Sequence, residues 1–271
     1  MRNYVLNNSQ MNIMKYLKDG KRILTVKILY KKLNTNFVPD GFKTDYEKYN
    51  LSVETDGKVN IEADFYPGVI RGLDTLSQLI DRNEDVKNEY RIKYTPINIK
   101  DGPSYSYRGL MLDTSKEYYY PAAIKQMLDG MMLTRMNVFH WHFMDSDSMP
   151  MYLQSYPDMV NYTAFRPQQI YTPEMVKDIV KYAKIRGIKI IPELETPAKV
   201  NSLGHYPPLK QLIHCYKDNS DKSNRNGLPP NTIMDIENDK TFEFLNNLLK
   251  DIQKSFDPEI FHLGGDQSDS S

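Results

Sequence analysis

The chain has 271 residues, which is long for one compact domain. Its 35 basic and 35 acidic residues give a formal net charge of zero, and no basic run is present, so we expect no nucleic-acid binding. No apolar stretch reaches the roughly 18 to 20 residues that cross a membrane, and no secretory signal precedes the first strand. The single cysteine, Cys215, cannot form a disulfide within the chain.

The first hundred residues predict a small α+β domain, residues 1–100. Alternating apolar and polar residues indicate strands at 22–30, 49–55, 58–63 and 90–94. Asp56-Gly57 is typical of a hairpin turn, and a helix is predicted from Pro67, with Ile80 on its buried face. Residues 95–105 have turn residues and little periodicity, so we expect a linker there.

After residue 104 the pattern changes to alternating strands and helices. The strands are predicted at 108–113, 136–144, 188–194 and 259–263. Between them lie a helix opened by Pro121, a helix with Thr172 as N-cap and Gly187 past its end, and a helix over 238–256 that buries Phe242. Short apolar strands separated by amphipathic helices favour parallel βα units.

Polar clusters follow each of these four strands. Their members are Asp113, His140, His142, Asp145, Glu193, Glu195, His262 and Asp266. Because the carboxyl ends of parallel strands meet on one face, we expect these side chains to share a pocket. A single carboxylate after a strand is often a helix cap, but the pattern repeats over four strands and therefore favours a site.

Four segments carry a family resemblance, in this order and spacing: YRGLMLDTSKEYYYP, RMNVFHWHFMDSDSMP, GIKIIPELETP and FHLGGDQ. Together they resemble the first half of the catalytic barrel of glycoside hydrolase family 20, the β-N-acetylhexosaminidases. The segment YNLSVETDGKVNIEADFYPGVIRGLDTLSQL is similar to the α+β domain that precedes that barrel. The resemblance implies an α/β fold in which residues 104–271 form about four βα units of a TIM (β/α)8 barrel.

The resemblance also implies a mechanism for removing terminal β-linked N-acetylglucosamine or N-acetylgalactosamine. In this family the acetamido oxygen of the substrate attacks the anomeric carbon, an Asp holds the acetamido group, and the next Glu acts as general acid. The matching positions are Asp266 and Gln267. An amide has no ionisable proton to deliver, so we expect impaired or absent activity.

Other family roles fall on five further residues. The resemblance places Arg108 at the sugar hydroxyls and puts Asp145 and His142 in the network that supports the site. Glu195 and Lys199 follow the third strand, where Lys199 replaces a histidine that would orient the acid; Lys199 could also pair with Glu195.

The sequence leaves other interpretations open. Only four predicted strands cannot close a barrel, so we expect a fragment whose open edges favour self-association. A non-catalytic carbohydrate binder or a barrel-completing subunit is the alternative. A metal-dependent hydrolase is ranked lower; its candidate ligands are His140, His142, Asp145, His262 and Asp266.

The expected partners are glycoconjugates that end in N-acetylhexosamine. The family resemblance implies no metal and no other cofactor, and it implies a lysosomal or secreted location.

Overall fold

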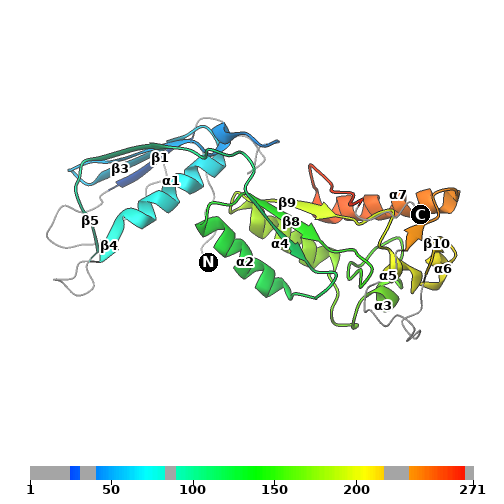
Figure 1. Cartoon of the computed structure of the whole chain (residues 1–271). Helices are drawn as coiled ribbons and strands as arrows, with labels where there is room; N and C mark the ends of the chain where they lie inside the picture. The colour runs from blue at the N-terminus through cyan, green and yellow to red at the C-terminus, as the bar shows by residue number, and fades with distance from the viewer. Residues whose placement is uncertain (1–24, 31–40, 83–89, 217–231, 266–271) are drawn as a thin grey trace. The chain divides into compact units, whose positions relative to one another are not determined.

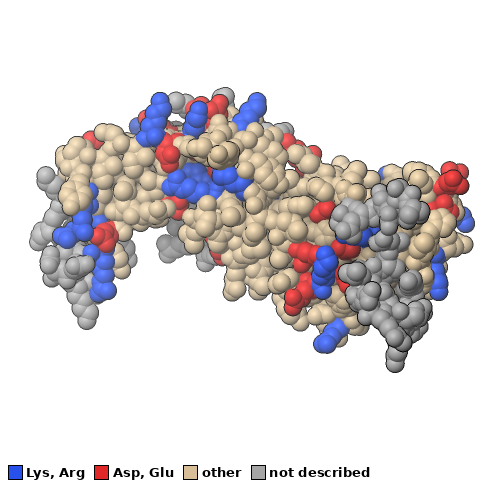
Figure 2. Space-filling view, viewed as in Figure 1, with Lys and Arg blue, Asp and Glu red and all other residues tan. Residues whose placement is uncertain are grey.

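The computed structural model describes residues 25–30, 41–82, 90–216 and 232–265. The chain divides into two compact units. The first comprises Met1–Arg108, Met132–Arg135 and Ile185–Gly187, and the second comprises Gly109–Met131, Met136–Lys184 and Ile188–Ser271. Figure 2 shows basic and acidic side chains interspersed on one face. Within the described residues, no helix is both long enough and apolar enough to span a bilayer.

The first unit is built on a four-stranded sheet with the order β1-β3-β2-β6 (Figure 1). The strands are β1 (Thr25–Tyr30), β2 (Tyr49–Val53), β3 (Lys58–Ala63) and β6 (Ile97–Asp101). β1 pairs with β3 in parallel, whereas β2 pairs antiparallel with β3 and β6. The predicted hairpin between β2 and β3 is confirmed, and Gly57 takes the positive φ that its turn requires.

Helix α1 (Tyr66–Leu79) covers one face of this sheet and packs at short range. A Cβ on Gly72 would lie 2.6 Å from Cγ2 of Ile61 and 3.3 Å from the ring of Tyr49, so only glycine allows this approach. The core between helix and sheet contains Val26, Tyr49, Leu51, Val53, Val59, Ile61, Ala63, Val69 and Leu76.

Two predictions for the first unit are wrong. Residues 95–105 contain β6, which pairs with β2, instead of a linker alone. The signal was the alternation of Ile97 and Ile99, which turn residues on both sides obscured. Ile80 is 40% exposed, because it leaves the helix to begin β4 (Ile80–Arg82), which pairs with β5 (Tyr90–Ile92). The short 3₁₀ helix η1 (Thr44–Glu47) precedes β2.

The second unit is built on three parallel strands in the order β7-β8-β9. These are β7 (Gly109–Asp113), β8 (Val138–His142) and β9 (Lys189–Glu193), and helices α2 (Pro121–Leu133) and α4 (Pro173–Lys184) connect them. Thr172 caps α4 by accepting from the backbone N–H of Met175 at 3.3 Å, as the sequence predicts. The alternation of strands and helices is therefore confirmed.

Shorter elements surround the carboxyl ends of these strands. They are α3 (Val160–Thr163), α5 (Asn201–Gly204), α6 (Pro207–Lys210), β10 (Ile213–His214) and β11 (Ile233–Met234). Figure 1 shows α3, α5 and α6 close to one another at this end of the unit. Here β10 and β11 form an antiparallel pair.

Helix α7 (Asp239–Phe256) buries a different face from the predicted one. Phe242 is 56% exposed, whereas Phe244 and Phe256 are buried. The ring of Phe256 lies 5.4 Å from Trp141 and 5.7 Å from Phe143, so these aromatic contacts select the competing face of the helix. The strand predicted at 259–263 is reduced to one parallel bridge between His262 and Glu193.

Candidate active site

One row of polar residues crosses the carboxyl ends of the parallel strands. Asp113 on β7 lies opposite His142 on β8, and His142 lies opposite Glu193 on β9. The bridge from Glu193 to His262 continues the row to a fourth segment. The register thus brings together side chains from residues 113 to 262, because parallel strands align their carboxyl ends.

Glu193 is the centre of this cluster. Its side chain is buried, and its Oε2 lies 2.8 Å from Nδ1 of His142 and 2.6 Å from Nε2 of His140. The second carboxylate oxygen lies 3.0 Å from Nδ1 of His262. The His140 nitrogen is off the line of a hydrogen bond, in spite of its short distance to Glu193. One buried carboxylate therefore meets three imidazoles.

The two histidines on β8 have pKa values that are shifted in opposite directions. Burial alone lowers the pKa of His142, but its contacts with Asp145 and Glu193 outweigh burial and raise that pKa to about 10. Burial lowers the pKa of His140, in spite of the nearby Glu193. Burial would raise the pKa of Glu193, yet the bond and charge of His142 hold it below its usual range. His142 is therefore an imidazolium between two carboxylates at neutral pH.

Asp145 joins the other side of His142. Its Oδ2 lies 3.4 Å from Nε2 of His142 and 3.4 Å from Nζ of Lys116, and its Oδ1 accepts from the backbone of Ser146 at 2.5 Å. Burial would raise the pKa of Asp145, but its bond to His142 keeps it low. The backbone oxygen of Asp145 accepts from Oγ of Ser202 at 2.6 Å, which ties the loop after β8 to α5.

Asp113 mainly shapes its own loop. Its Oδ1 accepts from the backbone N–H groups of Ser115 and Lys116 at 2.9 and 3.0 Å. The side-chain oxygens of Ser115 and Ser148 each donate to the other's backbone carbonyl at 2.5 Å. These bonds fix the loops that follow β7 and β8. Asp113 caps no helix, because α2 begins only at Pro121.

Glu195 supports the turn that leads to Asp266 and Gln267. Its Oε1 accepts from the backbone N–H of Gly265 at 2.9 Å, and a Cβ on Gly264 would lie 2.6 Å from that oxygen. Gly264 also has a φ of +72°. Both this backbone conformation and the lack of space for a Cβ therefore require glycine at this position. Asp266 and Gln267 themselves lie outside the described residues.

The structure places the two remaining predicted residues as follows. Lys199 follows β9, has a φ of 56°, and donates its backbone N–H to the carbonyl of Thr232 at 2.8 Å. Arg108 belongs to the first unit, where its guanidinium contacts both carboxylate oxygens of Glu47 at 2.6 Å and donates to the carbonyl of Tyr105. Its contact with sugar hydroxyls stays a prediction.

Three groups of side chains in the described ranges could offer a metal ion three ligand atoms. They are His140, Glu193 and His262; Asp113, His142 and Asp145; and His142, Glu193 and Glu195. Ligand atoms about 2.0 Å from a tetrahedral zinc ion would be about 3.3 Å apart. Glu193 lies closer than this to all three histidines, at 2.6 to 3.0 Å, and its contact with His142 is an ion pair.

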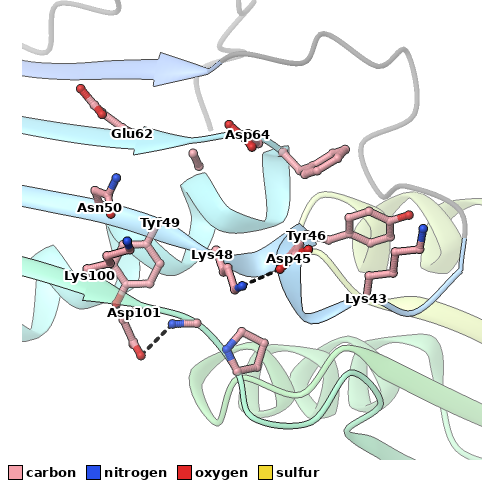
Figure 3. A pocket seen from close by; sticks show the side chains of 14 residues that line it. Lys43, Asp45, Tyr46, Lys48, Tyr49, Asn50, Glu62, Asp64, Lys100 and Asp101 are labelled. Atoms are coloured by element: carbon pink, nitrogen blue, oxygen red, sulfur yellow. Dashed lines mark hydrogen bonds and ion pairs between the residues drawn. The ribbon is translucent and has the colours of Figure 1, made fainter.

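A separate hollow of about 1010 Å³ lies in the first unit, and Figure 3 shows its side chains. Lys48 pairs with Asp45 at 2.6 Å, and Asp101 accepts from the backbone of Gly102 at 2.8 Å. Charges of both signs line this hollow, without the carboxylate and imidazole cluster of the second unit. We therefore place the candidate site at the strand ends of the second unit.

Comparison with known protein families decides the ancestry. Residues 105–271 match the family described as glycosyl hydrolase family 20, catalytic domain, and residues 7–79 match beta-acetyl hexosaminidase like. The chain belongs to glycosyl hydrolase family 20. Family neighbours of known structure are TIM barrels matched over part of their length, so the second unit is a partial barrel, preceded by a small domain. The predicted fold class is confirmed.

Individual relatives agree with this assignment. Beta-hexosaminidase 3 of Arabidopsis thaliana is 36% identical over 225 residues, and the chitooligosaccharidolytic beta-N-acetylglucosaminidase of Ostrinia furnacalis is 34% identical over 226 residues. Each alignment covers 82% of this chain but only 39% and 37% of those proteins. The chitobiase of Flavobacterium johnsoniae superposes with a TM-score of 0.72 and 30% identity, over 89% of this chain and 34% of the chitobiase.

Proposed function

We propose that this chain binds terminal β-linked N-acetylhexosamine at the strand ends of the second unit and has little or no hydrolytic activity of its own. Family membership and the cluster around Glu193 support the sugar site. Asp266 follows the glycine turn held by Glu195, at the position whose family role is to hold the acetamido group. The expected sugar contacts of Arg108 and Asp145 belong to the same proposal.

Gln267 is the residue from which we infer little or no hydrolytic activity. The family acid delivers a proton to the departing oxygen, and an amide has none to deliver. Removing a general acid typically costs about 10²- to 10⁴-fold in rate. Lys199 changes the same neighbourhood, because a fixed ammonium would favour ionisation of any nearby acid.

Hydrolysis of N,N'-diacetylchitobiose and of a 2,4-dinitrophenyl β-N-acetylglucosaminide tests this proposal. We expect background turnover of the disaccharide by the native chain, and a gain of about 10² or more in the double variant Gln267→Glu, Lys199→His. The dinitrophenyl glycoside should gain less, because its leaving group needs no proton. Gln253→Glu on α7 makes the same chemical change elsewhere and should leave turnover unchanged. Native turnover equal to that of ordinary family members, unaffected by Gln267→Ala, would contradict the proposal.

A second candidate function is a subunit that associates through the barrel edge. β7 has a strand neighbour on one side only among the described residues, and Leu110 and Met111 on it are 40% and 54% exposed. Unpaired strand edges with exposed apolar side chains favour pairing with another chain. Sedimentation velocity at several concentrations tests this, and a monomer at all of them would contradict it.

A metal-dependent hydrolase is ranked below both of these candidate functions. The short contact of Glu193 with His142 favours an ion pair over a coordinated ion, and one equivalent of zinc retained by the purified protein would reverse that ranking. A lysosomal or secreted location remains an expectation from family membership.

A further inference from the structure

One face of the sheet in the first unit points away from α1, and it carries the polar side chains of β2. The first, third and fifth residues of this strand are buried in the core beneath α1, whereas Asn50 is exposed and Ser52 is half-buried. Residues two positions apart in a strand point to the same side, so Asn50 and Ser52 share the outer face. This face therefore presents a carboxamide and a hydroxyl from one strand.

The segment Asn50-Leu51-Ser52 has the sequence of an acceptor for N-linked glycosylation. The reaction needs a carboxamide and a hydroxyl residue two positions later, and any residue except proline can lie between them. Such triplets also occur by chance. A site is indicated only where the amide is accessible and the folded chain has room for a sugar.

The amide of Asn50 meets the first of these conditions. Within the part of the chain that the structure describes, its side chain forms no hydrogen bond. Asn60 on β3 differs, because its Nδ2 donates to Oγ of Ser52 at 3.2 Å. Asn50 instead lies between Glu62 on β3 and Lys100 on β6, as Figure 3 shows. Both of these neighbouring side chains are long and flexible, so they can make room for a sugar on Asn50.

The hollow of the first unit meets the second condition. Its volume is about 1010 Å³, and Asn50 lies in its lining. Sites of about 300 to 1,000 Å³ hold small molecules, so this hollow has room for a disaccharide. Its wall also includes Lys43, Glu62 and Lys100, which offer donors and acceptors to the hydroxyl and acetamido groups of a sugar.

Tyr46 adds a flat aromatic ring to the lining of this hollow. Its ring centre lies 4.7 Å from that of Phe65, with 63° between the ring planes, and this edge contact holds the ring in place. Tyr46 precedes Asn50 by four residues, which a chain can span in at most about 14 Å. The first sugars linked to Asn50 therefore come within reach of the ring, whose apolar face fits the C–H face of a pyranose.

We propose that Asn50 is an N-glycosylation site and that the hollow of the first unit holds the first sugars of its glycan. Nδ2 of Asn50 attacks the anomeric carbon of an oligosaccharide that is linked to a lipid diphosphate. A C–N bond forms, the C–O bond to the diphosphate breaks, and the amide loses one proton while the lipid diphosphate leaves. The site is used when the chain passes through the secretory pathway, and it is independent of the sugar site proposed in the second unit.

Expression of the full chain behind a cleavable secretory signal in cultured mammalian cells tests the modification. Mass spectrometry of the chain recovered from cells and medium should show a glycan on the peptide that contains Asn50. Ser52→Ala should abolish this glycan, whereas Ser52→Thr should keep it, because threonine retains the hydroxyl.

Asn98→Gln is the matched control for these variants. Asn98 lies opposite Ser52 on β6 and is exposed on the same face, but the residue two positions after it is Lys100. The glycan on Asn50 should therefore persist in Asn98→Gln. An unmodified Asn50 in the native chain, or one that is modified equally in Ser52→Ala, overturns the proposal.

Urea unfolding tests whether the hollow holds the sugars. Enzymatic removal of N-glycans should lower the urea midpoint of the native chain, and it should lower that of Tyr46→Ala by a smaller amount. Comparing each chain before and after removal cancels the conversion of Asn to Asp by the enzyme and the effect of any glycan elsewhere.

Tyr90→Ala is the control for the loss of a ring, because Tyr90 is 68% exposed in the first unit and lies outside the hollow. Its midpoint should shift as much as that of the native chain. Equal shifts in the native chain and Tyr46→Ala, with Asn50 glycosylated in both, overturn the hollow as the place of the sugars, while the modification itself stands.

Discussion

At the residue scale, Glu193 sets the charge of the imidazoles around it. A buried carboxylate without a cation would be costly, and His142 supplies that cation at 2.8 Å. His142 also faces Asp145, so its positive charge is stabilised from two sides. His140 contacts only Glu193 among these carboxylates and is affected mainly by burial. Neighbouring histidines on one strand thus have opposite pKa shifts.

Replacing Glu193 by Gln should lower the pKa of His142 from about 10 towards its ordinary value of 6.5. The variant keeps the shape of the side chain but removes one of the two carboxylates. Imidazole NMR resonances followed between pH 5 and 11 measure the change. Glu243→Gln on the exposed face of α7 is the control and should leave the His142 titration unchanged. A His142 titration near 6.5 in the native chain would contradict the predicted charge.

The same pKa predicts a loss of stability at alkaline pH. His142 binds its proton more tightly in the folded chain than in the unfolded chain, so its contribution is fully present below about pH 6.5. That contribution disappears as the pH rises through about 10. The free energy of unfolding of the native chain should therefore fall between these pH values. In Glu193→Gln it should fall less, as urea titrations at each pH would show.

Gly264→Ala tests whether the turn before Asp266 needs glycine for steric reasons. The new Cβ would lie 2.6 Å from Oε1 and 2.8 Å from Cα of Glu195. Gly265→Ala also forces an L-residue to positive φ, but its Cβ meets nothing within 4 Å. We expect Gly264→Ala to lose about 1 to 3 kcal/mol more in free energy of unfolding than Gly265→Ala. Equal losses of stability in the two variants would show that the positive φ alone, and not the close contact with Glu195, requires glycine at position 264.

The sequence identified the members of this cluster, Glu193 included, but not that Glu193 is its centre. His142 and Asp145 were found because they lie where an apolar strand ends, and the parallel register places His142 opposite Asp113 and Glu193. Glu193 shares that pattern, but its role depends on side-chain directions that bring His140 and His262 to the same carboxylate. Strand spacing alone does not determine such contacts.

At the element scale, the approach of α1 to its sheet depends on Gly68 and Gly72, and Gly72 is the one that faces the side chain of Ile61. Gly72→Ala should lower the stability of the first unit by about 1 to 3 kcal/mol, because the Cβ would overlap Ile61. Gly130→Ala on α2 is the matched change in an open position, since its Cβ would meet nothing within 4 Å. That variant should gain about 0.5 to 1 kcal/mol from helix propensity. Thermal unfolding followed by circular dichroism measures both, and changes of the same sign would contradict the packing argument.

Elements with one clear apolar face were predictable. The alternation of apolar and polar residues predicts β2 and β3, and Thr172 predicts the start of α4. Helix α7 offers two apolar faces, and its contact with Trp141 and Phe143 selects the one with Phe256. This choice depends on residues more than a hundred positions away, so local periodicity could not make it.

At the scale of the whole molecule, the edge of β7 is the feature with the clearest consequence for association. Met111 lies opposite His140 in the strand register, so both belong to the sheet face that carries the imidazole cluster. In a closed barrel this face is interior, yet Met111 is 54% exposed. An interior side chain that meets water adds an apolar driving force to the unpaired backbone of β7.

Met111→Glu should therefore weaken self-association of the chain. Losing the burial of one large apolar side chain costs at least about 1.5 kcal/mol, so the dissociation constant should rise by roughly tenfold or more. Sedimentation velocity over a hundredfold range of concentration would measure this shift towards the monomer. Met175→Glu makes the same change on helix α4 of the same unit, at a residue that is 40% exposed, and should leave association unchanged. Equal weakening by both variants would indicate a general charge effect and would remove the β7 edge as the contact surface.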